Sequence, residues 1–183
     1  LHLYASENRD VVPWSNWAGG DEPGRAGWLY AMPVNASVDT PAFDVKTGLF
    51  WPILQTPKIY FCPRDGGHVP LFSERAQQSS SYVMNGAVNG YDRVTANHRL
   101  VKKLAEMPPT GVAFWETDET HPSFFNDGAS YPSEGVSRRH DQGAINGFFD
   151  GSVGYTKFAE WYAKAGSTNK NNLWCYPDSS NGR

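Results

Sequence analysis

The chain has 183 residues, a length that suits one globular domain spanning 1–183 with a core of its own. Charged residues make up only 19% and the formal net charge is −3, which excludes the strongly basic surface of a nucleic-acid-binding protein. Aromatic residues make up 14%, too many for a disordered chain. No apolar stretch approaches the roughly 20 residues that span a bilayer, and the first residues show no signal peptide.

Short elements separated by turns make up the first part of the chain. Residues 1–8 place apolar side chains on one face and are followed by Pro13, which predicts the end of a helix. Residues 13–48 are rich in turn-forming residues but also contain three Trp, which predicts a long loop region packed on the core. Apolar runs then predict strands at 58–62, 79–86 and 111–115, a helical turn at 48–54 and a short amphipathic helix at 100–105.

The strongest local signal lies near the C-terminal end. Apolar residues on both sides of Asp150-Gly151 predict a β-hairpin over 144–155, with both turn residues at the positive φ of a type I′ turn. Residues 157–165 place apolar side chains at spacings of three and four, which predicts a helix.

Patterns for nucleophilic catalysis and for metal binding are weak. His140 and Asp150 have the residue types of two members of a hydrolase triad, but no Ser stands in a nucleophile motif that would complete it. A zinc site would need Cys62, His68, Cys175 and perhaps His140, and Cys-x5-His is not an established ligand pair. We therefore expect no catalytic residue, no metal and no cofactor.

Two further features keep alternative functions open. Glu116 and Asp118 follow a predicted buried strand, and paired carboxylates near Trp residues are the pattern of a glycoside hydrolase. A solvated acidic loop is the simpler interpretation. Trp14, Trp17 and Trp28 lie outside apolar runs, so they either pack in the core or form the sugar-binding surface of a carbohydrate-binding module.

Several segments, taken together in order, resemble one large bacterial family. Residues 138–153 read RRHDQGAINGFFDGSV. This is similar to the His-x9-Asp-Gly signature of pseudopilin-like proteins, where the segment looks like Arg-His-x-x-Gly-Ala-Asn-x-x-Phe-x-Asp-Gly-x-Val, with Asn146 shifted by one place. Tyr60–Asp65 resembles the family's Cys-Pro-x-Asp element, and Ser80–Asn85 resembles its Ser-Tyr-x-Met-Asn element. Residues 1–8 are similar to the end of its long N-terminal helix.

The resemblance implies a structural, non-enzymatic subunit of a type II secretion or type IV pilus-like filament in the bacterial cell envelope. It also implies a pseudopilin-like α+β fold, in which an N-terminal helix stub packs on an antiparallel β-sheet with long loops. Such proteins begin with a leader that a prepilin peptidase removes, followed by an apolar helix. That helix anchors the subunit in the inner membrane and later packs in the filament core. The resemblance implies that it precedes Leu1 and is missing here. The implied partners are other pilin-like subunits and the secretion machinery, with this domain periplasmic or extracellular.

The resemblance also implies structural roles for the motif residues. These are His140, Asp150, Gly151, Cys62, Pro63 and Asp65. Asp150-Gly151 would form the hairpin turn, and His140 would hydrogen-bond a neighbouring loop. Because the implied location is oxidising, Cys62 and Cys175 either form a disulfide that fastens the C-terminal tail to the sheet or remain two buried free thiols.

Overall fold

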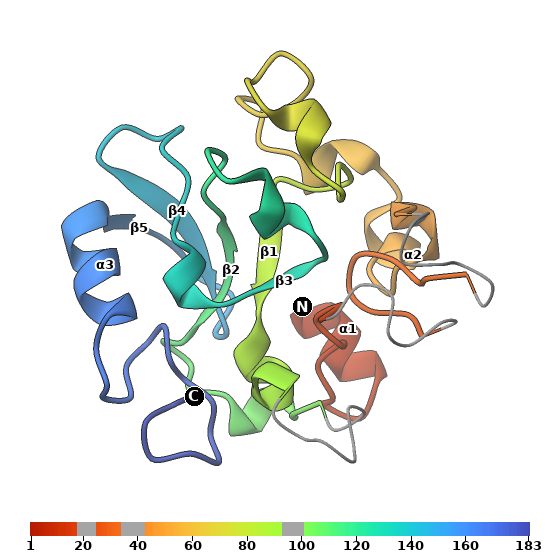
Figure 1. Cartoon of the computed structure of the whole chain (residues 1–183). Helices are drawn as coiled ribbons and strands as arrows, with labels where there is room; N and C mark the ends of the chain where they lie inside the picture. Colours follow the sequence, from red (N-terminus) through yellow and green to blue (C-terminus); the bar gives the residue numbers. More distant parts are fainter. Residues whose placement is uncertain (18–24, 34–42, 93–100) are drawn as a thin grey trace.

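A five-stranded sheet lies at the centre of the computed structural model, which describes residues 1–17, 25–33, 43–92 and 101–183. The strand order is β3-β1-β2-β4-β5 (Figure 1). Four strands form successive antiparallel pairs: β1 (Tyr82–Asn85), β2 (Val112–Glu116), β4 (Gly143–Phe148) and β5 (Val153–Lys157). The short strand β3 (Ala129–Ser130) pairs parallel with β1. The predicted α+β class is confirmed, whereas the sheet is mixed rather than wholly antiparallel.

Apolar cores lie on both faces of this sheet. Successive residues of a strand point to opposite faces, so Val83 and Met84 of β1 enter two different apolar clusters. In β2 the register shifts between Val112 and Phe114. Because of this irregularity Val112 and Trp115 belong to the same cluster, although they are three residues apart.

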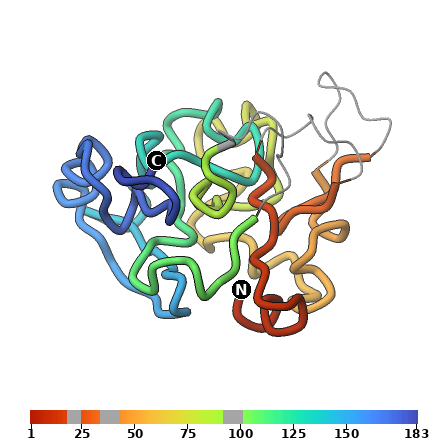
Figure 2. Tube along the Cα trace, turned by 90° about the horizontal axis from the view of Figure 1, so that it is seen from below, coloured from red at the N-terminus to blue at the C-terminus, as the bar shows by residue number. Residues whose placement is uncertain are grey.

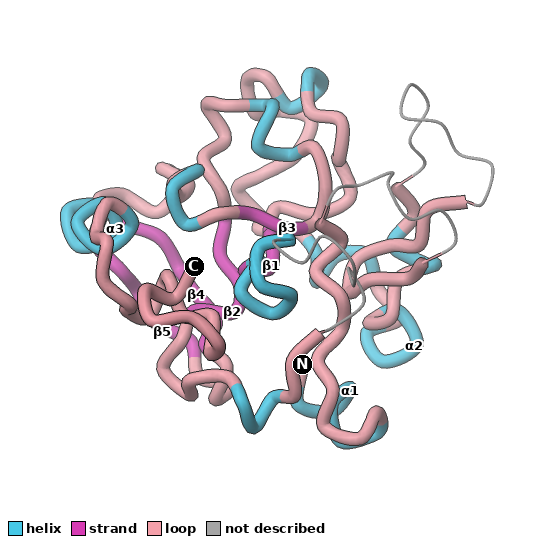
Figure 3. The backbone as a smooth tube through the Cα atoms, turned by 60° about the horizontal axis from the view of Figure 1, so that its bottom comes forward, coloured by secondary structure: helices cyan, strands magenta, loops and turns pink. Residues whose placement is uncertain are grey.

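The helices divide between the two cores. α3 (Phe158–Ala165) was predicted from its periodicity, and its Trp161 ring lies 5.3 Å from that of Trp115. α1 (His2–Glu7) and α2 (Trp51–Leu54) join the other core, where Tyr4 contacts Phe50 with ring centroids 5.9 Å apart. Figure 3 shows the strands between α3 on one side and α1 and α2 on the other, with loops making up most of the remaining chain. The predicted N-terminal helix is therefore confirmed.

The predicted hairpin is confirmed, but its turn is of another kind. β4 and β5 pair from Gly143↔Lys157 to Gly147↔Val153. The amide of Gly151 donates to the carbonyl of Phe148 at 3.0 Å, and only Gly151 of the turn has a positive φ, at 86°. This is the pattern of a three-residue loop with Gly in the left-handed position, not a type I′ turn. The Asp150 carboxylate instead accepts from the amide of Ser152 at 2.9 Å.

Aromatic side chains tie the long loop region to the core. Trp14 and Trp28 are buried, and the Trp28 indole donates to the carbonyl of Gly128 at 2.8 Å. Trp17 is half-buried against Tyr131. The packed loop is thus confirmed where the structure describes it; 18–24 and 34–42 lie outside the described residues. All seven Trp are described; Trp17 and Trp51 are half-buried and the other five are buried.

Three predicted elements differ from the structure. Residues 58–62 do not form a strand: Pro57–Tyr60 is a 3-10 helix, because Pro57 fixes a helical φ at its first position. The strand predicted at 79–86 is confined to β1, since the Gln77 side chain accepts from the Ser80 amide and turns the chain before it. The helix at 100–105 is a 3-10 turn, Leu104–Glu106, and residue 100 lies outside the described part.

The C-terminal tail returns to the sheet rather than extending away from it. The amide of Val112 donates to the carbonyl of Asn172 at 2.8 Å, which places the tail beside the start of β2 (Figure 2). Leu173 and Cys175 are fully buried, and the side-chain amide Nδ2 of Asn85 donates to the carbonyl of Leu173 at 3.0 Å. Among the described residues, no helix has the length and apolar character needed to cross a bilayer.

Candidate functional site

Three segments that are distant in sequence meet at one end of β1 and β2. Glu116 is the last residue of β2 and pairs with Tyr82 of β1. The loop carrying Cys62 is held there because the Cys62 amide donates to Ser81 Oγ at 3.1 Å. The segment before β4 arrives because the Ser137 amide donates to the carbonyl of Glu116 at 2.8 Å.

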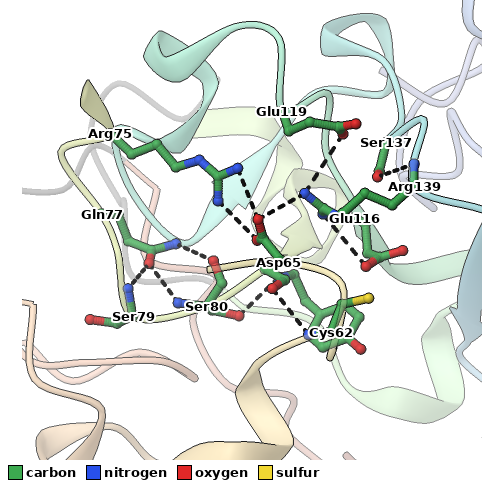
Figure 4. A network of polar contacts seen from close by, with 12 residues as sticks. Cys62, Asp65, Arg75, Gln77, Ser79, Ser80, Glu116, Glu119, Ser137 and Arg139 are labelled. Atoms are coloured by element: carbon green, nitrogen blue, oxygen red, sulfur yellow. Dashed lines mark hydrogen bonds and ion pairs between the residues drawn. The ribbon is translucent and has the colours of Figure 1, made fainter. Parts of the chain in front are cut away.

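A network of buried charges lies under this junction (Figure 4). Arg75 donates to both carboxylate oxygens of Asp65, at 2.9 and 3.1 Å, and both side chains are fully buried. Burial alone raises the pKa of Asp65, but the hydrogen bonds from Arg75 and the charge of Arg139 outweigh it and hold that pKa below its usual value.

Arg139 connects the three carboxylates of the network. Its guanidinium lies 3.1 Å from Asp65 Oδ1, 3.5 Å from Glu116 Oε1 and 3.7 Å from Glu119 Oε2. The Arg139 side chain is only 5% exposed, so these contacts are weakly screened by solvent. The network therefore fixes the relative positions of the loop at 62–65, the end of β2 and the segment before β4.

Cys62, Glu116 and His140 form a compact cluster of side chains beside this network. His140 Nε2 lies 2.7 Å from Glu116 Oε2 and 3.5 Å from Cys62 Sγ. The three atoms all lie within 4.8 Å of one another. Cys62 and Glu116 are buried, whereas the His140 side chain is 26% exposed and opens the site to solvent.

The geometry of this set does not favour a cysteine nucleophile. In a catalytic triad the base contacts the nucleophile through one ring nitrogen and the acid through the other. Here the thiol and the carboxylate both approach Nε2 of His140. Burial, with a further contribution from Glu116, also raises the pKa of the Cys62 thiol, which opposes formation of the reactive thiolate.

The two catalytic pairs weighed as alternatives from the sequence have no recorded contact between their members. Asp150 lies at the hairpin tip and His140 precedes the other end of β4, so they do not form a dyad. Asp118 Oδ1 accepts from the amide of Thr120 at 3.0 Å, so this carboxylate closes a local turn. Glu116 instead belongs to the Arg139 network. The hydrolase pair of Glu116 and Asp118 therefore has no support in the contacts of either residue.

The disulfide between Cys62 and Cys175 is not formed, and the alternative of two buried free thiols is what the structure shows. The cysteines occupy opposite ends of β1: Cys62 binds Ser81, and Cys175 Sγ lies 3.7 Å from Asn85 Nδ2. Complete burial raises the pKa of Cys175 to about 12. Because His68 is exposed, the four-residue zinc set weighed from the sequence is not assembled either.

The sequence patterns did not predict that Glu116 would lie beside Cys62 and His140, because they paired Glu116 only with Asp118. The signal for Glu116 was a carboxylate directly at the end of an apolar strand, where the side chain is buried. Of the residues to which the resemblance gave structural roles, Cys62, Asp65 and His140 meet in the network, and Asp150-Gly151 forms the hairpin turn. Comparisons with protein-family models, curated proteins and solved structures find no match.

Proposed function

We propose that this chain is the globular part of a structural subunit of a type II secretion or type IV pilus-like envelope filament. The observation that carries the proposal is the meeting of the family-like segments. Cys62 and Asp65 of the Cys-Pro-x-Asp element, Ser81 of the Ser-Tyr element and His140 of the signature lie in one network, although up to 78 residues separate contacting members.

The contacts of these residues support a structural role. Ser81 holds the loop at Cys62, and Asp65 binds two arginines from other loops. Asn85, the last residue of the Ser-Tyr-x-Met-Asn element, donates to the carbonyls of Val112 and Leu173 and so joins β1 to β2 and the tail. Side chains paired in this way fasten loops to a sheet, which supports a structural role.

Exposed apolar side chains support contact with other subunits. Leu3 on α1 is 55% exposed and Val153 on the edge strand β5 is 71% exposed. In the proposed subunit α1 is the end of the family's long N-terminal helix, which would anchor the protein in the inner membrane and pack in the filament core. Apolar surface near that helix is where neighbouring globular domains would pack.

The test uses the full-length gene product expressed in a bacterial host with and without a prepilin peptidase. We expect peptidase-dependent removal of a short leader, detected by mass spectrometry, and filaments visible by electron microscopy. Leu3→Asp is expected to reduce filament number, whereas Ser6→Asp, at another exposed position of α1, is the matched control. A product that the peptidase leaves unprocessed, or that stays monomeric after processing, would contradict the proposal.

A further inference from the structure

Two side chains approach the same ring nitrogen, Nε2 of His140, and a purely structural role does not explain both contacts. One ring nitrogen carries either one proton or one lone pair, yet both Glu116 Oε2 and Cys62 Sγ point at it. Glu116 Oε2 is buried and accepts no hydrogen bond of proper geometry in the structure. We propose that Cys62, Glu116 and His140 bind a divalent transition-metal ion of the zinc class, with a fourth position open to solvent.

The donor set selects this class of ion. A thiolate, an imidazole and a carboxylate together suit Zn²⁺ and similar first-row ions. Ca²⁺ and Mg²⁺ take oxygen ligands almost alone and would leave the sulfur and nitrogen unused. Three protein ligands with one open position are the arrangement in which zinc retains a water molecule or another exchangeable ligand.

The distances fit a tetrahedral ion with little rearrangement. Zn–S of about 2.3 Å and Zn–N of about 2.0 Å place sulfur and nitrogen about 3.5 Å apart at a tetrahedral angle, and Cys62 Sγ lies 3.5 Å from His140 Nε2. Nitrogen and oxygen ligands of such an ion are about 3.3 Å apart, against 2.7 Å for His140 and Glu116. His140 Nε2 and Glu116 Oε2 would therefore have to separate by about 0.6 Å.

The supporting contacts orient the ligands as a metal site requires. Arg139 Nη2 lies 3.5 Å from Glu116 Oε1, which leaves Oε2 directed toward the other two ligands. The Cys62 backbone is fixed by Ser81. Ligands held by a second layer of polar contacts keep their geometry while the ion exchanges.

The charge of the network also calls for a cation. The carboxylates of Asp65, Glu116 and Glu119 face two guanidinium groups, those of Arg75 and Arg139. One negative charge is thus in excess, and a thiolate at Cys62 would add another. A divalent ion balances both. Protonation of His140 is the alternative that balances the network without an ion, and the experiment below separates the two.

A surface cavity borders the site at Cys62. Its volume is about 430 Å³, and it is lined by Pro57, Lys58, Phe61, Cys62, Pro63 and Asp65. The His140 ring is partly exposed, and this exposure is the contact with solvent through which an ion would enter. The site would then be an exchangeable one rather than a closed structural centre.

The test is a titration of the reduced, chelator-treated chain with Co²⁺ as a spectroscopic probe, followed by displacement with Zn²⁺. We expect one equivalent of Co²⁺ to produce a thiolate-to-cobalt charge-transfer absorption that Zn²⁺ abolishes. Cys62→Ser is expected to remove the band. Glu116→Gln and His140→Gln are expected to weaken binding by more than the roughly 10–100-fold that losing a supporting residue costs. Cys175→Ser and His68→Gln are the matched controls and should retain the band.

A second measurement needs no variant and so does not depend on whether one folds. Zn²⁺ should slow alkylation of Cys62 in the wild-type chain relative to the same chain in chelator, with a cysteine-free peptide of the same digest as the internal reference in mass spectrometry. Absence of a cobalt band in the wild type, or a band that survives Cys62→Ser, would overturn the site and leave protonated His140 as the balancing charge. The filament proposal is tested on leader processing and would be unaffected by either outcome.

Discussion

Replacing Arg75 by Met is the most informative change to the buried network. Arg75→Met keeps the unbranched apolar stem of the side chain but removes the guanidinium, which lies 3.8 Å from the ring centroid of Phe125. It removes the two hydrogen bonds of 2.9 and 3.1 Å to Asp65. Asp65 keeps its contact with Arg139 at 3.1 Å, so its carboxylate is not left wholly unpaired.

The expected loss in the free energy of unfolding is about 3 kcal/mol, the lower end of the range for breaking a buried pair. For a domain of this size that corresponds to a fall in Tm of about 6–12 °C. Urea unfolding followed by Trp fluorescence measures the loss, and Arg64→Met, at an exposed arginine of the loop that carries Asp65, is the matched control. A loss below about 1 kcal/mol, equal to that of the control, would be typical of a solvated pair and would refute the reasoning.

The pH dependence gives the same prediction a second test. The pKa of Asp65 is lowered in the folded state, so its pairing stabilises the protein fully above the unfolded-state pKa of about 3.9. That stabilisation disappears as the pH falls through the lower folded-state value. The difference between wild type and Arg75→Met should therefore be constant from about pH 7 to pH 5 and shrink below about pH 4.

Three further predictions concern the turn, the thiols and the metal. Gly151→Ala should lower the free energy of unfolding by roughly 1–2 kcal/mol because of the positive φ, whereas Gly67→Ala, with nothing within 4 Å of the added Cβ, should change it little in thermal unfolding. Cys175 should alkylate only as fast as the protein unfolds, because burial raises its pKa to about 12; labelling as fast as a free thiol would contradict this. Zn²⁺ at 100 times its Kd should raise the free energy of unfolding by about 2.7 kcal/mol, reversibly with chelator and not in Cys62→Ser.

Local patterns predicted the elements whose structure is decided locally. The hairpin followed from Asp150-Gly151 between apolar runs, and α3 from the spacing of Phe158, Trp161 and Ala165. The prediction of a strand at 58–62 was wrong because the apolar residues of this segment are equally compatible with a strand and with a buried 3-10 turn. Pro57 and the bond from the Ser81 amide to the carbonyl of Tyr60 decide between the two, and that bond is tertiary.

The candidate site was largely beyond prediction for the same reason. Cys62 and His140 are separated by 78 residues, and nothing in their own segments indicates that they meet. Their meeting depends on which loops close over the end of β2, which is set by bonds such as that from Ser137 to Glu116. Likewise, a Trp in a loop has no periodicity that tells core from surface, so only the fold showed that Trp14 and Trp28 are buried.

The tail that returns to β2 has a consequence for synthesis of the chain on the ribosome. The Asn85 side chain of β1 donates to the carbonyl of Leu173 in the tail, and these two residues are 88 positions apart. At 5–20 residues per second, roughly 4–18 s separate the emergence of the two. During that interval the Asn85 side-chain amide lacks one of its native acceptors, the carbonyl of Leu173, and the apolar residues that the tail covers lack their native contacts with it. A nascent chain stalled before residue 173 should thus stay open to proteases and chaperones, although every strand of the sheet has already been made.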